Sequence, residues 1–183
     1  MVSVIKPPKQ KKCRICKEVF TPINPLQSVC GQKCALDHAK VLREKKERSE
    51  RRITREKLKR KSDYVREAQT AFNAYIRQRD SVLPCISCGR HHTGQIHAGH
   101  YRATSVAPAL RFNEFNVHSQ CQPCNCHKHG NLIDYRINLI KRIGQAKVDW
   151  LESNHQPMHY TIEELKEIKQ KYNRMTRELK AKQ

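Results

Sequence analysis

The chain has 183 residues, of which 37 are Lys or Arg and 17 are Asp or Glu, so its formal net charge is +20. A charge of this size favours a polyanionic partner, most often nucleic acid, and the basic stretches lack the aromatic-rich apolar face of a membrane-surface protein. Hydrophobic residues make up only 37%, which excludes one large core and predicts small parts stabilised by other means, such as bound metal.

The chain has no run of about 18 apolar residues and no apolar core of signal-peptide length near its start. We therefore expect a protein that does not contact membranes and that works inside the cell. Disulfides are rare in that reducing compartment. The nine cysteines, most of which fall into pairs, therefore predict metal sites.

Residues 1–12 form a basic, proline-containing arm that precedes the first group of cysteines. Cys13-x-x-Cys16 and Cys30-x-x-x-Cys34 are separated by 13 residues, a spacing typical of a structural zinc finger with four thiolate ligands. Unmetallated surface cysteines are the alternative. No catalytic set accompanies this group, so we expect it to anchor the following helix and to contact DNA. The candidate contacts here are Lys9, Lys11, Lys12 and Arg14.

From residue 35 to about residue 79 there is no Gly or Pro, which predicts a long helix that Ser62-Asp63 could cap internally and split in two. Residues 40–61 contain twelve basic and four acidic residues. This segment is therefore a candidate rail for DNA phosphates, with a merely solvated face as the alternative. The candidate contacts are Arg48, Arg51, Arg52, Arg55, Lys59 and Arg60.

Three further helical regions are expected. After Tyr64 the apolar residues recur at spacings of three and four, which predicts an amphipathic face docked on the domain that follows. Residues 145–153 predict a short helix. Thr161 and Glu164 form a capping box that starts the last helix.

Residues 84–131 contain the second group of cysteines, Cys85-x-x-Cys88 and Cys121-x-x-Cys124. Zinc takes four tetrahedral ligands in structural sites, so the two pairs predict a four-thiolate zinc site. The 32 residues between them are long enough for a hairpin, with candidate strands near residues 95–101 and 110–118. A helix should begin near Pro123 and continue to about residue 144.

This second group carries residues that a purely structural zinc module does not need. His100 and Asn116 lie between the cysteine pairs, and Asn125 comes directly after them. An imidazole can accept a proton from water near neutral pH, and amide oxygens suit a hard divalent ion. Metal-assisted hydrolysis of a phosphodiester is the chemistry that this set favours.

The set resembles the HNH (ββα-metal) nucleases, and the Cys-x-x-Cys-Asn form of residues 121–125 is similar to phage endonuclease VII, a junction-resolving nuclease. The resemblance implies that His100 is the general base and that Asn116 holds the loop and ring of that histidine in place. It also implies that Asn125 binds a catalytic divalent ion, Mg²⁺ or Mn²⁺.

One position departs from that family, which often has Asp just before the base as a second metal ligand; here the residue is Gly99. On a helix that begins near residue 123, His129 lies four residues beyond Asn125 on the same face and is the first candidate to replace it. His97 is the second, although on a regular strand it points away from His100 unless a bulge turns it. An imidazole ligand favours Mn²⁺ as well as Mg²⁺.

Nearly the whole chain, including its HAGHY motif at residues 97–101, resembles the lambdoid phage NinG (Rap) recombination proteins. The resemblance implies a metal-dependent endonuclease that cuts Holliday junctions or other branched DNA in phage recombination. It implies a homodimer in the host cell cytoplasm, with phage or host recombination proteins as further partners. Two alternatives stay open: a non-catalytic zinc protein that binds nucleic acid, and a sequence-specific HNH nuclease of homing or restriction type.

The expected fold class is α+β, mainly helical, built around a zinc-stapled ββα-metal (HNH) core at residues 84–144. A basic arm and zinc finger at residues 1–38 and a long basic helical region at residues 39–83 would precede this core. C-terminal helices would follow it at residues 145–183.

Overall fold

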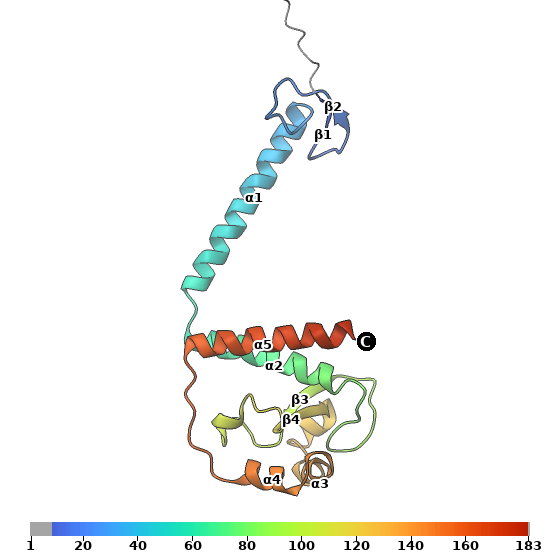
Figure 1. Ribbon diagram of the computed structural model, residues 1–183, viewed down its shortest axis with the longest axis vertical. Coiled ribbons are helices and arrows are strands. Elements are labelled where there is room, and N and C mark those ends of the chain that lie inside the picture. The colour runs from blue at the N-terminus through green and yellow to red at the C-terminus, as the bar shows by residue number, and fades with distance from the viewer. Residues whose placement is uncertain (1–8, 183) are drawn as a thin grey trace, which may run out of the picture. The chain divides into compact units, whose positions relative to one another are not determined.

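A computed structural model describes residues 9–182, so the first eight residues of the predicted basic arm lie outside the described part of the chain. The described residues form a mixed α+β protein that is mainly helical, with two small two-stranded sheets (Figure 1). The chain divides into two units, Met1–Lys59 and Arg60–Gln183. The boundary between these units falls inside the basic helical region predicted for residues 39–83.

The first unit contains a small sheet and one long helix. Strand β1 (Lys11–Lys12) pairs antiparallel with β2 (Val19–Phe20), and helix α1 (Gln32–Lys57) follows after a loop. None of the 26 residues of α1 is buried. Exposed i,i+4 ion pairs of the kind that α1 carries stabilise a helix by only about 0.3–0.5 kcal/mol each. Its charged side chains therefore form an exposed surface.

The predicted break in the long helix is confirmed, although its cap is not the expected one. Helix α1 ends at Lys57, and helix α2 (Lys61–Arg79) begins after the extended residue Arg60. The backbone N–H of Arg60 donates to Asp63 Oδ2 at 2.9 Å. Asp63 thus supplies the reciprocal half of a capping box, and the N-cap is Arg60 rather than Ser62.

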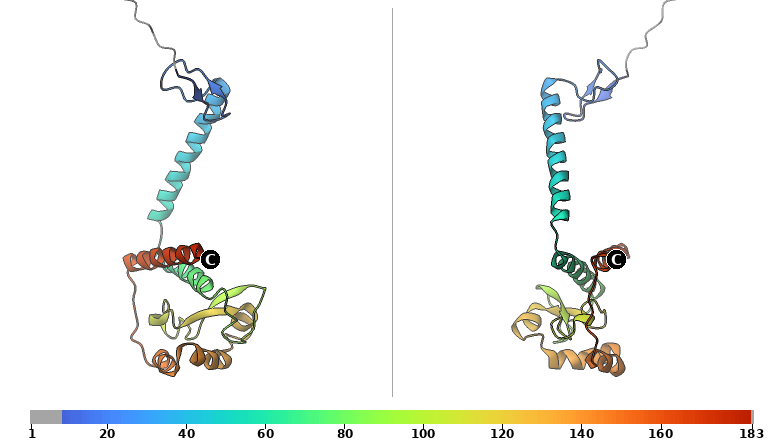
Figure 2. Two further views of the ribbon diagram at one scale, coloured as in Figure 1. Left: turned by 45° about the vertical axis from the view of Figure 1, so that its right-hand side comes forward. Right: turned by 90° about the vertical axis from the view of Figure 1, so that its left-hand side faces the viewer.

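The second unit is organised around a hairpin of β3 (Ile96–His100) and β4 (Val117–Cys121), which are antiparallel and pair Gly99 with His118. Helices α2 and α5 (Ile162–Ala181) lie side by side on one side of this hairpin (Figures 1 and 2). Phe72 of α2 meets Tyr172 of α5 edge to face, with ring centroids 4.8 Å apart. The amphipathic face predicted after Tyr64 is therefore confirmed as a core-packing face.

Helices α3 (Leu132–Ile143) and α4 (Gln145–Glu152) cover the other side of the hairpin. Their buried side chains include Tyr135, Leu139, Val148 and Leu151. The hydroxyl of Tyr135 donates to the carbonyl of Gly99 at 2.9 Å, which ties α3 to the first strand. Among the described residues, no helix is both long enough and apolar enough to span a bilayer.

The second strand begins later than predicted. Instead of a strand near residues 110–118, Pro108 opens a short 3₁₀ helix, η1 (Pro108–Leu110), and Asn113 then caps a turn. Asn113 Oδ1 accepts hydrogen bonds from the N–H groups of Phe115 at 2.9 Å and Asn116 at 3.3 Å. This side chain satisfies the backbone locally, so regular pairing starts only at Val117.

The prediction of a continuous helix from Pro123 to residue 144 is wrong. A short π-helix, η2 (Pro123–His127), is followed by a turn before α3 begins at Leu132. Three consecutive residues of this turn, His129, Gly130 and Asn131, have positive φ angles of 48°, 89° and 44°. A right-handed helix cannot pass through such a run, so the two helices stay separate.

Acidification should destabilise the second unit through His118. This side chain is only 3% exposed, and burial lowers its pKa to about 3. Between that value and about 6.5 the unfolded chain binds a proton that the folded chain rejects, so stability falls as pH drops. We expect the free energy of unfolding to decrease by about 2 kcal/mol between pH 7 and pH 5 from this residue. Urea unfolding of the parent and His118→Asn proteins at pH 7 and pH 5, with zinc content checked, measures this decrease. If the free energy of unfolding depends on pH equally in both proteins, His118 is not its cause.

Candidate functional site

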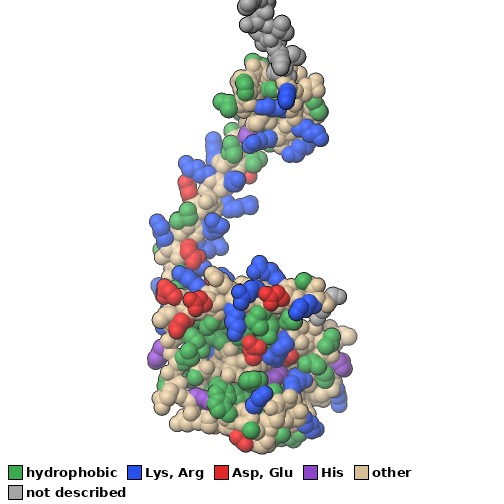
Figure 3. All heavy atoms as spheres, viewed as in Figure 1, with side chains coloured by type: hydrophobic (Ala, Val, Ile, Leu, Met, Phe, Trp, Pro, Cys, Tyr) green, Lys and Arg blue, Asp and Glu red, His purple; other side chains and the backbone are tan. Residues whose placement is uncertain are grey.

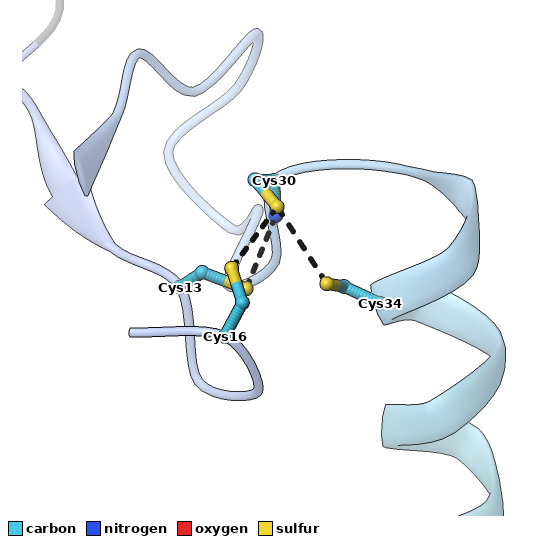
Figure 4. Close-up of side chains that lie close together, drawn as sticks. All are labelled: Cys13, Cys16, Cys30 and Cys34. Atoms are coloured by element: carbon cyan, nitrogen blue, oxygen red, sulfur yellow. Dashed lines mark hydrogen bonds between the residues drawn. The ribbon is translucent and has the colours of Figure 1, made fainter. Parts of the chain in front are cut away.

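The first four predicted zinc ligands come together in the N-terminal unit. Cys13 and Cys16 follow β1, Cys30 lies before α1, and Cys34 is in its first turn; their side chains point toward one another (Figure 4). The four sulfur atoms lie within 4.8 Å of one another. Neighbouring thiols raise the pKa of Cys30 to about 12, because several sulfur atoms lie close together. This cluster could bind a zinc ion.

The second four predicted ligands also come together, in the second unit. Cys85 and Cys88 precede β3, Cys121 ends β4, and Cys124 lies in η2; their sulfur atoms are again within 4.8 Å of one another. The backbone N–H of Cys121 donates to Cys85 Sγ at 3.3 Å. Burial is the main cause that raises the pKa of Cys121 to about 12. A zinc ion here would join both ends of the hairpin to the first turn after it.

His100 lies at the end of β3 with one ring nitrogen fixed. Its Nε2 is 3.1 Å from the carbonyl oxygen of Arg111. A carbonyl oxygen only accepts, so Nε2 carries the proton, and in the neutral ring Nδ1 holds the free electron pair. Burial lowers the pKa of His100. The ring is therefore neutral at pH 7 and able to accept a proton through Nδ1.

Asn116 fixes the loop that supplies this carbonyl. The side chain is fully buried just before β4, and its Nδ2 donates to the carbonyls of Arg102 at 3.0 Å and Leu110 at 3.2 Å. Its Oδ1 accepts from the N–H of Arg102 at 2.8 Å. Asn116 thus forms a clasp that ties the start of the loop after β3 to the end of η1. Because Leu110 precedes Arg111, the clasp also positions the carbonyl that holds His100.

We expect Asn116→Ala to loosen this arrangement. Removing the amide leaves three backbone groups without their partner in a buried place, which should cost about 3 kcal/mol of unfolding free energy. NMR should also show faster exchange of the His100 Nε2 proton, because the Arg111 carbonyl is no longer held. Asn113→Ala is the matched control, since Asn113 caps a turn in the same loop. An equal loss of protection at His100 in both variants would contradict the proposed clasp.

His100 opens onto a pocket to which both sides of the second unit contribute. Helix α2 supplies Gln69 and Asn73, and the loop after β3 supplies Arg102 and Arg111. Asn125 and His129 line the same pocket, which contains no Asp or Glu among its lining residues. The sequence did not identify residues 69, 73 and 111 as part of the site, because no sequence spacing shows that α2 packs against the hairpin and its loop.

Two of the three candidate metal ligands, Asn125 and His129, line this pocket, and the third, His97, contacts Asn125. Asn125 Nδ2 is 2.9 Å from His97 Nδ1, and His97 Nε2 is buried without a hydrogen-bond partner among the described residues. His129 lines the same pocket as Asn125. The helical spacing from which it was predicted is wrong. This residue lies in the turn after η2, with φ 48°, and not one helical turn beyond Asn125. The structure thus places His97 in contact with Asn125 and His129 in the same pocket as Asn125.

The predicted DNA contacts differ in how far the chain itself engages them, and among the arginines of α1, Arg51 lies 3.9 Å from Glu47. Arg48, Arg51, Arg52 and Arg55 line one surface of α1 together with Glu44 and Glu47, and Lys and Arg side chains outnumber acidic ones along this helix (Figure 3). Lys12 and Arg14 are exposed, as is Lys9, whereas Lys11 Nζ donates to the carbonyls of Pro25 and Gln27. Lys59 is paired with Glu56 at 2.6 Å, and Arg60 is the N-cap of α2.

Comparisons with known proteins agree over nearly the full length. The family model described as bacteriophage lambda NinG protein matches residues 5–182. The chain is 45% identical over 191 residues to protein ninG of Escherichia phage 933W, covering 94% of this chain and 95% of that protein. It is 45% identical over 193 residues to protein ninG of Escherichia phage lambda, with the same coverages. It is 44% identical over 183 residues to that of Salmonella phage P22, with 90% of each chain covered. No solved structure matches significantly.

Proposed function

The chain belongs to the bacteriophage lambda NinG protein family, and on that premise we propose that it is a metal-dependent endonuclease of HNH type that cuts branched DNA such as Holliday junctions. One observation carries the proposal. A buried asparagine clasps a loop whose carbonyl holds His100 Nε2, which leaves Nδ1 as a base beside the pocket that Asn125 also lines. A histidine in a purely structural zinc module needs no such support.

The chain's own residues account for the proton transfer. His100 Nδ1 accepts a proton from the attacking water, and its Nε2–H stays on the Arg111 carbonyl, so the ring does not turn as it becomes charged. Asn116 keeps that carbonyl in place. A divalent ion, when bound, would supply Lewis-acid stabilisation of the phosphate oxygens.

The donors around Asn125 fit such an ion. The Asn125 amide oxygen, His97 Nδ1 and His129 would hold it. Asn125 and His97 are already neighbours, since Asn125 Nδ2 lies 2.9 Å from His97 Nδ1, and a bound ion would replace this hydrogen bond. A neutral set containing imidazole favours Mn²⁺ at least as much as Mg²⁺.

The structure gives a steric reason why no carboxylate precedes His100. A Cβ atom at Gly99 would lie 2.1 Å from Gln120 Oε1. Gln120 is itself fixed, since its Nε2 donates to Ser87 Oγ at 2.6 Å and to the carbonyl of Gly130 at 2.5 Å. A side chain at residue 99 would have to displace this buried network, so the ion would rely on imidazole and on the DNA phosphates for its remaining ligands.

The proposed substrate rests on charge and on the family resemblance. The stripe Arg48, Arg51, Arg52 and Arg55 is suited to phosphates and carries no base-reading pattern, which favours recognition by shape. A four-way junction offers two related cleavage sites, which a homodimer can address together. Phage or host recombination proteins in the host cell cytoplasm are the partners that this role implies.

A cleavage assay on synthetic DNA tests the proposal. Zinc-loaded protein should cut a four-way junction in Mn²⁺ or Mg²⁺ and should leave it intact in EDTA, with linear duplex of the same sequence cut far more slowly. Binding without any cleavage would favour a non-catalytic nucleic-acid-binding zinc protein. Efficient cutting of linear duplex at one sequence would favour the homing or restriction type.

Replacing Arg48, Arg51, Arg52 and Arg55 with Gln should weaken junction binding with little effect on the fold, because α1 has no buried residue. Log K falls as log salt rises, and each lost phosphate contact makes this slope shallower by about 0.9. The magnitude of the slope should therefore decrease by about 2 to 4. Fluorescence anisotropy between low and moderate salt measures it. An unchanged slope would show that this face is only solvated.

A further inference from the structure

We propose that Arg111 is a catalytic residue whose guanidinium binds the phosphate group undergoing cleavage. This inference rests on the proposed endonuclease function and adds a phosphate-binding residue to it. The guanidinium lines the pocket that His100 and Asn125 also line. A phosphodiester must enter this pocket for His100 to activate the attacking water, and Arg111 would then lie beside it.

Arg111, like Arg102 but unlike Arg79 and Arg136, has no carboxylate partner among the described residues. Arg79 is paired with Asp80 at 2.7 Å, and Arg136 is paired with Glu152 at 2.7 Å. Arg102 shares the pocket with Arg111, but its Nη1 donates to the carbonyl of Glu152 at 3.2 Å. Arg111 is thus a half-buried cation in a pocket lined by no acidic residue, which favours an anionic ligand there.

A polar chain from α2 orients this guanidinium without neutralising it. Arg111 Nη1 donates to Gln69 Oε1 at a long 3.4 Å, and Gln69 Nε2 donates to Asn73 Oδ1 at 2.8 Å. The contact is weak enough for a phosphate oxygen to replace or share it. The remaining N–H donors of the planar group can form the paired hydrogen bonds that phosphate oxygens accept.

Arg111 also connects the phosphate to the base. Its carbonyl holds His100 Nε2, so one residue positions the base through its backbone and the substrate through its side chain. Burial lowers the pKa of His100, and the positive charge of Arg111 adds to this effect. During attack, negative charge grows on the phosphate oxygens, and a fixed cation there stabilises the transition state more than the ground state.

Junction cleavage by Arg111→Gln, Arg111→Lys and Arg102→Gln proteins tests this role. We expect Arg111→Gln to lower kcat by about 100-fold, and Arg111→Lys, which keeps the charge without the planar group, to lose about tenfold. Arg102→Gln removes the same charge from the same pocket and should lose far less, because the backbone carbonyl of Glu152 already holds that guanidinium and the carbonyl that binds His100 belongs to Arg111. The acid limb of the pH profile should move to higher pH in Arg111→Gln, since His100 loses a neighbouring cation; a purely structural residue would not move it.

The outcomes separate this proposal from the proposed function. If the parent protein cleaves and Arg111→Gln cleaves within about threefold of it, the role of Arg111 is overturned and the endonuclease stands. If the parent protein never cleaves, the proposed function fails, and the junction affinities of parent and Arg111→Gln decide: about fivefold weaker binding supports the phosphate contact, and equal binding overturns it. If Arg111→Gln does not fold, Arg111→Lys replaces it in both comparisons, and parent-like behaviour overturns the role.

Discussion

His100→Ala should abolish junction cleavage by the zinc-loaded protein, with a loss of about 10²–10⁴-fold in rate and no loss of junction affinity. The variant removes the proposed general base and leaves the Asn116 clasp intact, because that clasp is made between an asparagine side chain and backbone groups. Single-turnover cleavage with Mn²⁺, together with anisotropy binding, measures both quantities. Zinc content should stay unchanged, since His100 belongs to neither cysteine cluster.

The pH profile of the parent protein adds an independent check on His100. Burial lowers the pKa of this ring below its ordinary value of about 6.5, so the neutral form dominates at pH 7. Cleavage should therefore be nearly constant from pH 8 to pH 7 and should fall only on further acidification. His159→Ala, which removes an exposed histidine elsewhere in the unit, is the matched control. Equal cleavage by His100→Ala and the parent protein would remove His100 from the mechanism.

The sequence predicted those parts of the site whose chemistry depends on local spacing. The two cysteine groups needed only the spacing of their pairs, because a Cys-x-x-Cys turn presents both thiols to one ion. Asn125 could be placed near the zinc ligands because it follows Cys124 directly. Asn116 could be named, but its three hydrogen bonds depend on a loop that closes only in the folded chain.

Predictions that needed an exact backbone path failed. His129 was placed by helical periodicity, but left-handed residues at 129–131 end η2 before it. The second strand was placed too early, because Asn113 satisfies the turn with its own side chain. The effect of Gly99 could not be seen either, since its neighbour Gln120 is known only once β3 and β4 are in register. Tertiary contacts between α2 and the hairpin likewise place Gln69 against Arg111.

The two cysteine clusters should differ sharply in what their loss does. Each draws all four sulfur ligands from its own unit, and Cys121 also ends the strand that carries the hairpin pairing. Structural zinc contributes about 10–16 kcal/mol of apparent binding energy in small zinc modules. Cys121→Ser should therefore disorder the hairpin, lower the Tm of the second unit by at least about 10 °C and eliminate cleavage.

Cys13→Ser should leave that second unit folded while it releases the other zinc ion and weakens junction binding. Zinc content by mass spectrometry, NMR of the hairpin amides and thermal unfolding distinguish the two variants. Cys126→Ser is the control for cysteine replacement, because Cys126 is exposed and belongs to neither cluster; it should retain two zinc ions and the parent Tm. If Cys121→Ser kept an ordered hairpin, the cysteine cluster of the second unit would not be required to stabilise it. The position of Asn125 beside His97 would then need another cause.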